Sequence, residues 1–226
     1  MFGFTPDEVR IFTKLKTPEK VQDFLESIPI NFEPDGDTCI SPRRVLREGR
    51  AHCIEGAMLA AAAFMVHGEK PLLFDLRSAP HDHDHVVALF KKYGRWGAVS
   101  KTNHAVLRYR EPVYMTLREL ALSYFHEYFT DDGKKTMREF STRPFDLSTY
   151  ISRGWMTSEE DVWYVPEDLD DAPHESILQH GQARTLRLAD PIEIEVGKSV
   201  VWKKKKTPAR SQEGAADVMR TRVRTI

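Results

Sequence analysis

The chain has 226 residues, of which 41% are hydrophobic and 30% are charged, and this is the composition of an ordinary globular protein. Its net charge of −1 gives no sign of a nucleic-acid or anionic-membrane partner. The longest apolar run, 57–66, is about half as long as a membrane helix, and residues 1–10 lack the pattern of a signal peptide. Two cysteines cannot form a disulfide framework, so we expect a cytoplasmic protein with one functional thiol.

Start signals for three short helices occupy the N-terminal region. Thr5-Pro6-Asp7-Glu8 combines a capping hydroxyl, a proline in the first turn and a glutamate three residues after the cap. Thr17-Pro18 opens a second helix, which Pro29 ends, and Ser41-Pro42 opens a third.

A longer, alanine-rich helix is predicted to begin near Cys53 and to stop at Gly68. Apolar residues recur along one face of it, namely Ile54, Met58, Ala61 and Met65. Its many alanines indicate that other elements pack closely around it. We therefore expect a central helix with Cys53 in its first turn.

Strands are predicted for 71–77 and for 85–90, and the second is apolar on both faces, which is typical of an interior strand. Residues 91–94 form a turn, and 95–101 return as an antiparallel partner. Further on, 116–129 reads as an amphipathic helix and 158–165 as a short helix ended by Pro166. Alternation in 185–202 predicts one or two strands around Asp190-Pro191.

The composition changes at Lys203. The segment Lys203 to Ile226 has eight basic and two acidic residues, a net charge of +6, and little apolar content. Such a segment is predicted to be a basic disordered tail. The sequence therefore predicts one α+β domain over 1–202 followed by a tail over 203–226.

Cys53 is the candidate nucleophile. The first turn of a helix stabilises a thiolate, and the free N–H groups there can bind an oxyanion. His85, at the start of a predicted strand, is the candidate base. Considered alone, a single cysteine is more often a small core hydrophobe.

The order of these elements resembles the transglutaminase-like superfamily. The resemblance rests on Cys53-Ile-Glu-Gly56, His85-Val-Val-Ala-Leu-Phe90, Gly94-Arg-Trp96 and Ser100, and it covers roughly 38–103. It implies a papain-like fold, in which the helix that bears the cysteine packs on an antiparallel sheet that bears the histidine. It also implies thiol-dependent acyl transfer on an amide or ester. In the family a glycine commonly lies two residues before the nucleophile, and here that residue is Ala51.

The residue that orients His85 is the main departure from the family pattern. The position four residues after the Trp is usually Asp, and here it is Ser100. A hydroxyl can accept a hydrogen bond from the imidazole but adds no charge. Asn103 is the second candidate and Asp75 the third, whereas Asp84, adjacent to His85, points to the opposite face of the strand.

The other histidines of this region are not expected to take part in the chemistry. His81, His83 and His85 alternate with aspartates, but ligands so close together rarely hold a metal without distant partners, so no metal or other cofactor is expected. His52 is next to the nucleophile, yet a neighbour of this kind usually points away, and it receives no catalytic role.

The sequence thus predicts a cysteine-dependent hydrolase or acyltransferase with Cys53, His85, Ser100 and Asn103 at its site. Its partner would be a protein or small-molecule acyl substrate, with no membrane or nucleic-acid partner. The absence of an EF-hand pattern favours a hydrolase over a crosslinking enzyme. The alternatives are a non-catalytic binding domain of the same fold, which Ser100 favours, and a metal protein that uses the histidine loop.

The tail prediction can be tested by truncation. Removing Lys203 to Ile226 is expected to leave the melting temperature nearly unchanged, because a charged segment without apolar periodicity adds little to a core. Calorimetry of both forms measures this. A loss of several degrees would show that the segment docks on the domain.

Overall fold

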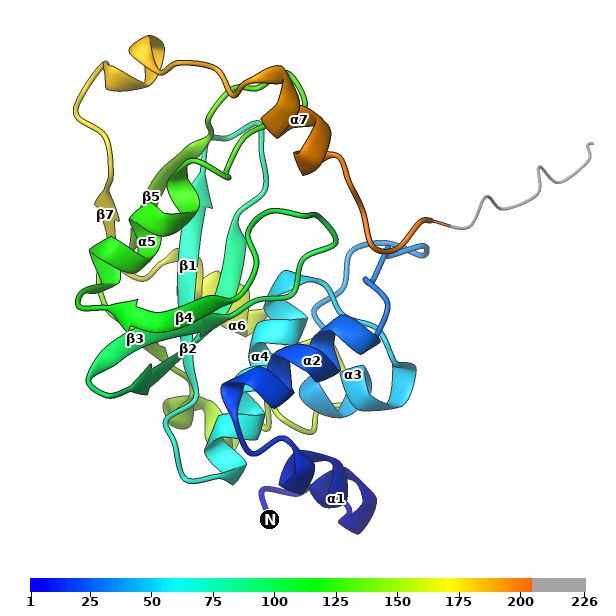
Figure 1. The fold of residues 1–226 in the computed structure, drawn as a ribbon. Helices are drawn as coiled ribbons and strands as arrows, with labels where there is room; N and C mark the ends of the chain where they lie inside the picture. Colours follow the sequence, from blue (N-terminus) through cyan, green and yellow to red (C-terminus); the bar gives the residue numbers. More distant parts are fainter. Residues whose placement is uncertain (205–226) are drawn as a thin grey trace, which may run out of the picture.

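The computed structural model describes residues 1–204, so nearly all of the predicted tail lies outside the described residues. An open antiparallel sheet runs through it in the order β4-β3-β2-β1-β5-β7, and β6 also pairs with β1 (Figure 1). The strands are β1 (Leu72–Ser78), β2 (His85–Lys92), β3 (Arg95–Val99), β4 (Arg110–Tyr114), β5 (Met137–Ser141), β6 (Phe145–Asp146) and β7 (His174–Ser176). Together with the helices, this arrangement confirms the α+β class.

The helices lie on both faces of the sheet (Figure 1). They are α1 (Pro6–Lys14), α2 (Pro18–Ser27), α3 (Pro42–Glu48), α4 (Cys53–Val66), α5 (Leu117–Phe125), α6 (Tyr164–Asp170) and α7 (Pro191–Gly197), with 3-10 turns η1 (Leu147–Arg153) and η2 (Gln182–Thr185). None of these described helices is long and apolar enough to cross a membrane.

Helix α4 is buried on nearly every side from Ile54 to Phe64. It packs on β2 and is surrounded by α1, α2 and α3. Val86 and Ala88 of β2 belong to the core around α4, whereas Val87 and Leu89 belong to a second core beneath α5. The prediction of a central helix beside an interior strand is confirmed, and small alanine side chains are what allow so many neighbours to approach α4.

The local signals near the N-terminus are confirmed as well. The Thr5 hydroxyl accepts from the backbone N–H of Glu8, whose carboxylate accepts in turn from Thr5. Strands β2 and β3 pair antiparallel as predicted. Tyr93 and Gly94 connect them with φ of 52° and 74°, and this left-handed pair matches the twist of a tight hairpin.

Two predictions in the C-terminal half are wrong, and the helix predicted for 116–129 is present but shorter. The predicted helix at 158–165 is replaced by α6, which begins at Tyr164 and holds Pro166 within its first turn, where proline is tolerated. The predicted strands in 185–202 are replaced by η2 and α7. Asp190 and Glu193 form a capping box at the start of α7 with Pro191 between them, a helix signal that outweighs the alternation. The helix predicted to reach residue 129 ends at Phe125.

Lys101 joins α2 to the end of the sheet. Its side chain is 1% exposed, and its Nζ donates to the carbonyls of Leu25 (2.8 Å) and Ile28 (2.6 Å) at the end of α2. Helix α4 passes so closely that a Cβ on Gly56 would lie 2.5 Å from the Lys101 Cβ. Burial lowers the pKa of Lys101 to about 8.

This burial predicts that stability depends on pH in the alkaline range. Between about pH 8 and 10.5 the unfolded chain keeps a Lys101 proton that the folded chain has lost, so the free energy of unfolding rises with pH. The full rise is about 3 kcal/mol, and Lys101→Met is expected to abolish it.

Urea unfolding of the wild type and the variant across this pH range measures the difference. Lys20→Met, an exposed position on the same helix α2, controls for loss of a surface charge. Curves that stay parallel for wild type and Lys101→Met would contradict the prediction.

Candidate active site

Cys53 is the first residue of α4 and is half-buried. Its backbone N–H therefore has no acceptor within the helix and can receive a ligand oxygen. The positive end of the helix dipole lies at the same place and favours a thiolate. The predicted position of this thiol at a helix start is confirmed.

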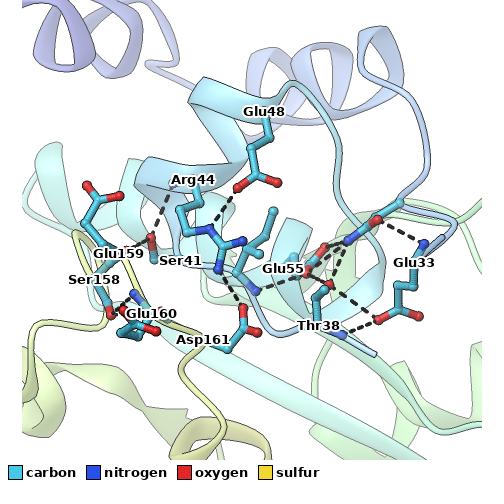
Figure 2. Close-up of polar contacts among 12 residues, drawn as sticks. Glu33, Thr38, Ser41, Arg44, Glu48, Glu55, Ser158, Glu159, Glu160 and Asp161 are labelled. Carbon is cyan, nitrogen blue, oxygen red and sulfur yellow. Dashed lines mark hydrogen bonds and ion pairs between the residues drawn. The ribbon is translucent and has the colours of Figure 1, made fainter. Parts of the chain in front are cut away.

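The start of α4 is held by Glu55, a fully buried carboxylate. It accepts hydrogen bonds from the backbone N–H groups of His52 (2.9 Å) and Ile40 (3.0 Å). It also accepts from the Thr38 hydroxyl at 2.8 Å and from the amide of Asn31. Figure 2 shows Thr38 between Glu55 and Glu33, whose carboxylate accepts from the Thr38 N–H at 2.7 Å. The loop before α3 is thereby fixed to the turn that carries Cys53.

His85 is bound to Ser100. The distance between His85 Nε2 and Ser100 Oγ is 2.8 Å, and Ser100 Oγ donates its own proton to the carbonyl of Leu107 at 2.6 Å. Because that proton is used, Ser100 Oγ accepts from Nε2–H of His85. The proton of a neutral His85 is thus held on Nε2, and Nδ1 is left for the thiol of Cys53.

The carbonyl of Leu107 is aimed by a strained backbone. Leu107 has a φ of 59°, in the left-handed region that a leucine rarely adopts. Its N–H donates to the carboxylate of Glu127 at 2.8 Å, which holds this conformation. Strain of this kind persists only where the surroundings impose it.

Helix α2 fixes the backbone of Ser100. Gln22 is 9% exposed, and its amide accepts from the Ser100 N–H at 2.9 Å and donates to the Ser100 carbonyl at 2.8 Å. Sequence reasoning missed Gln22, because nothing in a short amphipathic helix indicates a contact with a residue 78 positions away.

The other two candidates for orienting His85 lie elsewhere. Asn103 exchanges two hydrogen bonds with the backbone of Trp202, at 2.9 and 2.8 Å, and so holds the segment after α7. Asp75 binds His174 at 3.0 Å. Of the three, Ser100 alone contacts the imidazole of His85 in the described part of the chain. Register favoured it, because it follows the end of β3.

The expectation that His52 points away is wrong. Its Nε2 lies 2.9 Å from the carbonyl of Thr38, 3.3 Å from Glu55 and 3.5 Å from Glu33. Although burial of this ring lowers its pKa, the neighbouring Cys53 and Glu55 outweigh burial and raise the pKa of His52 to about 10. The missed signal was Glu55, which follows His52 at the spacing of a capping box.

The two thiols differ in their acidity. Burial would raise the pKa of Cys53, but hydrogen bonds to His52 and His85 and the charge of both rings outweigh it and hold the pKa well below its usual value. Cys39 is fully buried, and burial together with the charge of Glu55 raises the pKa of its thiol. Cys53 is therefore the thiolate of the pair near neutral pH.

A cleft of about 560 Å³ opens in front of Cys53 and His85. Its lining includes four carboxylate side chains, those of Asp82, Asp84, Glu127 and Asp131. Of the remaining loop histidines, His83 lines this cleft and His81 is exposed. The one group of side chains spaced to ligate a metal within the described residues is Asp75, Asp84 and Asp170, which includes none of these histidines.

The hydrogen bond to Ser100 predicts unequal effects of two alanine substitutions. Ser100→Ala is expected to slow alkylation of Cys53 near pH 6.5 roughly tenfold, since a bond to a charged group contributes about 1.5 kcal/mol or more. Asn103→Ala is expected to leave the rate unchanged and to lower stability. The measurement is the rate of iodoacetamide labelling against pH, located by peptide mass spectrometry.

Cys39 supplies an internal control, because a buried thiol is expected to react only in denaturant. A larger effect from Asn103→Ala than from Ser100→Ala would show that the amide orients His85 in solution.

No protein-family model matches this sequence, and no curated protein matches it significantly. The resemblance to the transglutaminase-like superfamily therefore stays a prediction from the residues quoted above.

Proposed function

We propose that this chain is a papain-related, transglutaminase-like cysteine enzyme that carries out acyl transfer on an amide or ester. The observation that carries the proposal is that Cys53 and His85 line one cleft, where His85 is held through Ser100 to the carbonyl of Leu107. A thiol at a helix start thus shares its cleft with an imidazole whose Nδ1 is not used by Ser100. Such a pair is suited to nucleophilic catalysis.

In the proposed reaction, the proton of the Cys53 thiol passes to Nδ1 of His85, and the thiolate attacks the carbonyl carbon of the substrate. The oxyanion that forms is received by the N–H of Cys53, which has no acceptor within α4. His85 then gives its proton to the departing amine or alcohol, which leaves a thioester on Cys53. Water or an amine attacks the thioester and loses its proton to His85, and the thiol is restored when the acyl group leaves.

A non-catalytic binding domain is the second candidate, and the uncharged Ser100 behind His85 favours it. A carboxylate in that position stabilises the imidazolium, whereas a hydroxyl only orients the ring. In this alternative the cleft would hold a ligand without forming a thioester.

Electrophilic acyl probes distinguish the two functions. Wild type is expected to form a covalent acyl adduct on Cys53 and to release it with time, whereas Cys53→Ala forms none. His85→Ala is expected to lower the acylation rate at least a hundredfold near pH 7, in line with the usual contribution of a general base. Intact-protein mass spectrometry follows each species.

Protein prepared with a chelator serves as the metal control and is expected to retain both fold and acylation. A folded wild type that resists every acyl probe would favour the binding domain. Loss of acylation with the chelator, restored by zinc, would favour a metal protein.

A further inference from the structure

His52 lies within 3.5 Å of two carboxylates, whereas the side chain that binds His85 is a hydroxyl. The Nε2 of His52 has the carboxylates of Glu55 and Glu33 within 3.5 Å, in addition to the carbonyl of Thr38. Nε2 therefore carries a proton, which it donates to the carbonyl of Thr38. The ring is mostly shielded from water, with 20% of its side chain exposed, so these contacts are only weakly screened.

The two carboxylates also need a cation. Glu55 is fully buried, and burying an unpaired charge is strongly unfavourable. Within residues 1–204, no lysine or arginine forms an ion pair with Glu55 or Glu33, and His52 is the one basic side chain that does. A protonated His52 therefore compensates the charge of this cluster.

The side chain that is hydrogen-bonded to His85 is uncharged, although carboxylates line the cleft in front of it. The Nε2 of His85 contacts the hydroxyl of Ser100, which contacts a backbone carbonyl. The negative charge that stabilises an imidazolium thus lies beside His52, the residue that precedes the nucleophile in the chain.

We propose that His52 is a catalytic residue: a permanent imidazolium, held by Glu55 and Glu33, that keeps Cys53 a thiolate while His85 exchanges protons. Only the acyl-transfer step of this inference rests on the proposed function, and the effect of His52 on the thiol does not. With His52 already charged, the negative charge left on sulfur is stabilised when the thiol proton passes to His85. No proton leaves His52 during the reaction, so its part is electrostatic.

The pH dependence of the thiol is set by several groups that face it or its partners. They are Glu33 and Cys39 from the loop before α3, Glu55 from α4, His85 from β2 and Tyr128 after α5. The cleft in front of the thiol adds Asp82, Asp84, Lys101, Glu127 and Asp131. Of all these groups, His52 and His85 are the ones that lower the pKa of the thiol. Removing either charge raises the proton affinity of the thiol.

The test is the pH midpoint of Cys53 alkylation in the full-length protein. His52→Gln is expected to raise the midpoint by about one to three pH units, the usual effect of losing one adjacent opposite charge. The alkylation rate should return to that of wild type at alkaline pH, because the thiolate is then fully formed. His67→Gln, at the other end of α4, is the matched control and should leave the midpoint unchanged.

A second variant covers the case in which His52→Gln does not fold. Glu33→Gln keeps an oxygen that accepts from the Thr38 N–H but removes one charge from beside His52. Because Glu55 still keeps His52 charged in this variant, the loss of a nearby negative charge is expected to leave the midpoint at or slightly below that of wild type. An unchanged midpoint in His52→Gln, or a raised midpoint in Glu33→Gln, would overturn the role of His52.

Acyl probes separate this inference from the proposed function. If His52→Gln raises the midpoint but wild type accepts no acyl group, the charge role of His52 stands and the acyl-transfer proposal fails. If wild type is acylated and His52→Gln keeps the wild-type midpoint and acylation rate, the proposed function stands and the role of His52 fails.

Discussion

The hydrogen bonds of the buried Glu55 carboxylate fix the start of α4, where Cys53 lies. The carboxylate satisfies donors from the loop over 31–40 and from the residue just before α4, so loop and helix cannot separate without leaving a charge unpaired. Because Glu55 lies in the same helical turn as Cys53, these bonds also fix the direction in which the thiol points. Folding and the environment of the thiol are therefore linked through one side chain.

A second set of contacts fixes Ser100, the hydrogen-bond partner of His85. The chain leaves β3 after Val99, and a strand end with no further partner would fray. Helix α2 prevents this, since Gln22 holds the backbone of Ser100 and the Lys101 ammonium binds the last carbonyls of α2. An N-terminal helix thus determines where the partner of His85 lies, although it contributes no reactive group.

The features that the sequence predicted are those encoded locally. Helix starts at Thr5 and at Ser41, the apolar helix after Cys53 and the hairpin after β2 all follow from short-range patterns. The failures have physical causes of two kinds. Near Asp190, the alternation of apolar residues was given more weight than the capping box. The contact of Gln22 joins residues 78 positions apart, and that of Asn103 joins residues 99 positions apart, so neither is visible in a local pattern. His52 was misjudged because its environment is set by Glu33 and Thr38, which pattern alone does not bring near it.

Whether Ser100 is compatible with catalysis depends on all the charges around the thiol of Cys53. If orientation and charge had to come from one residue behind the base, a hydroxyl there would argue against catalysis. Here the hydroxyl orients His85 through a bond whose direction is fixed by the carbonyl of Leu107. Two carboxylates lie instead around His52, the residue that precedes Cys53. An electrostatic field at sulfur is a sum over nearby charges, so a carboxylate–imidazolium pair can act from either side. The exchange of Asp for Ser at position 100 therefore separates orientation from charge and does not in itself remove the means of activating Cys53.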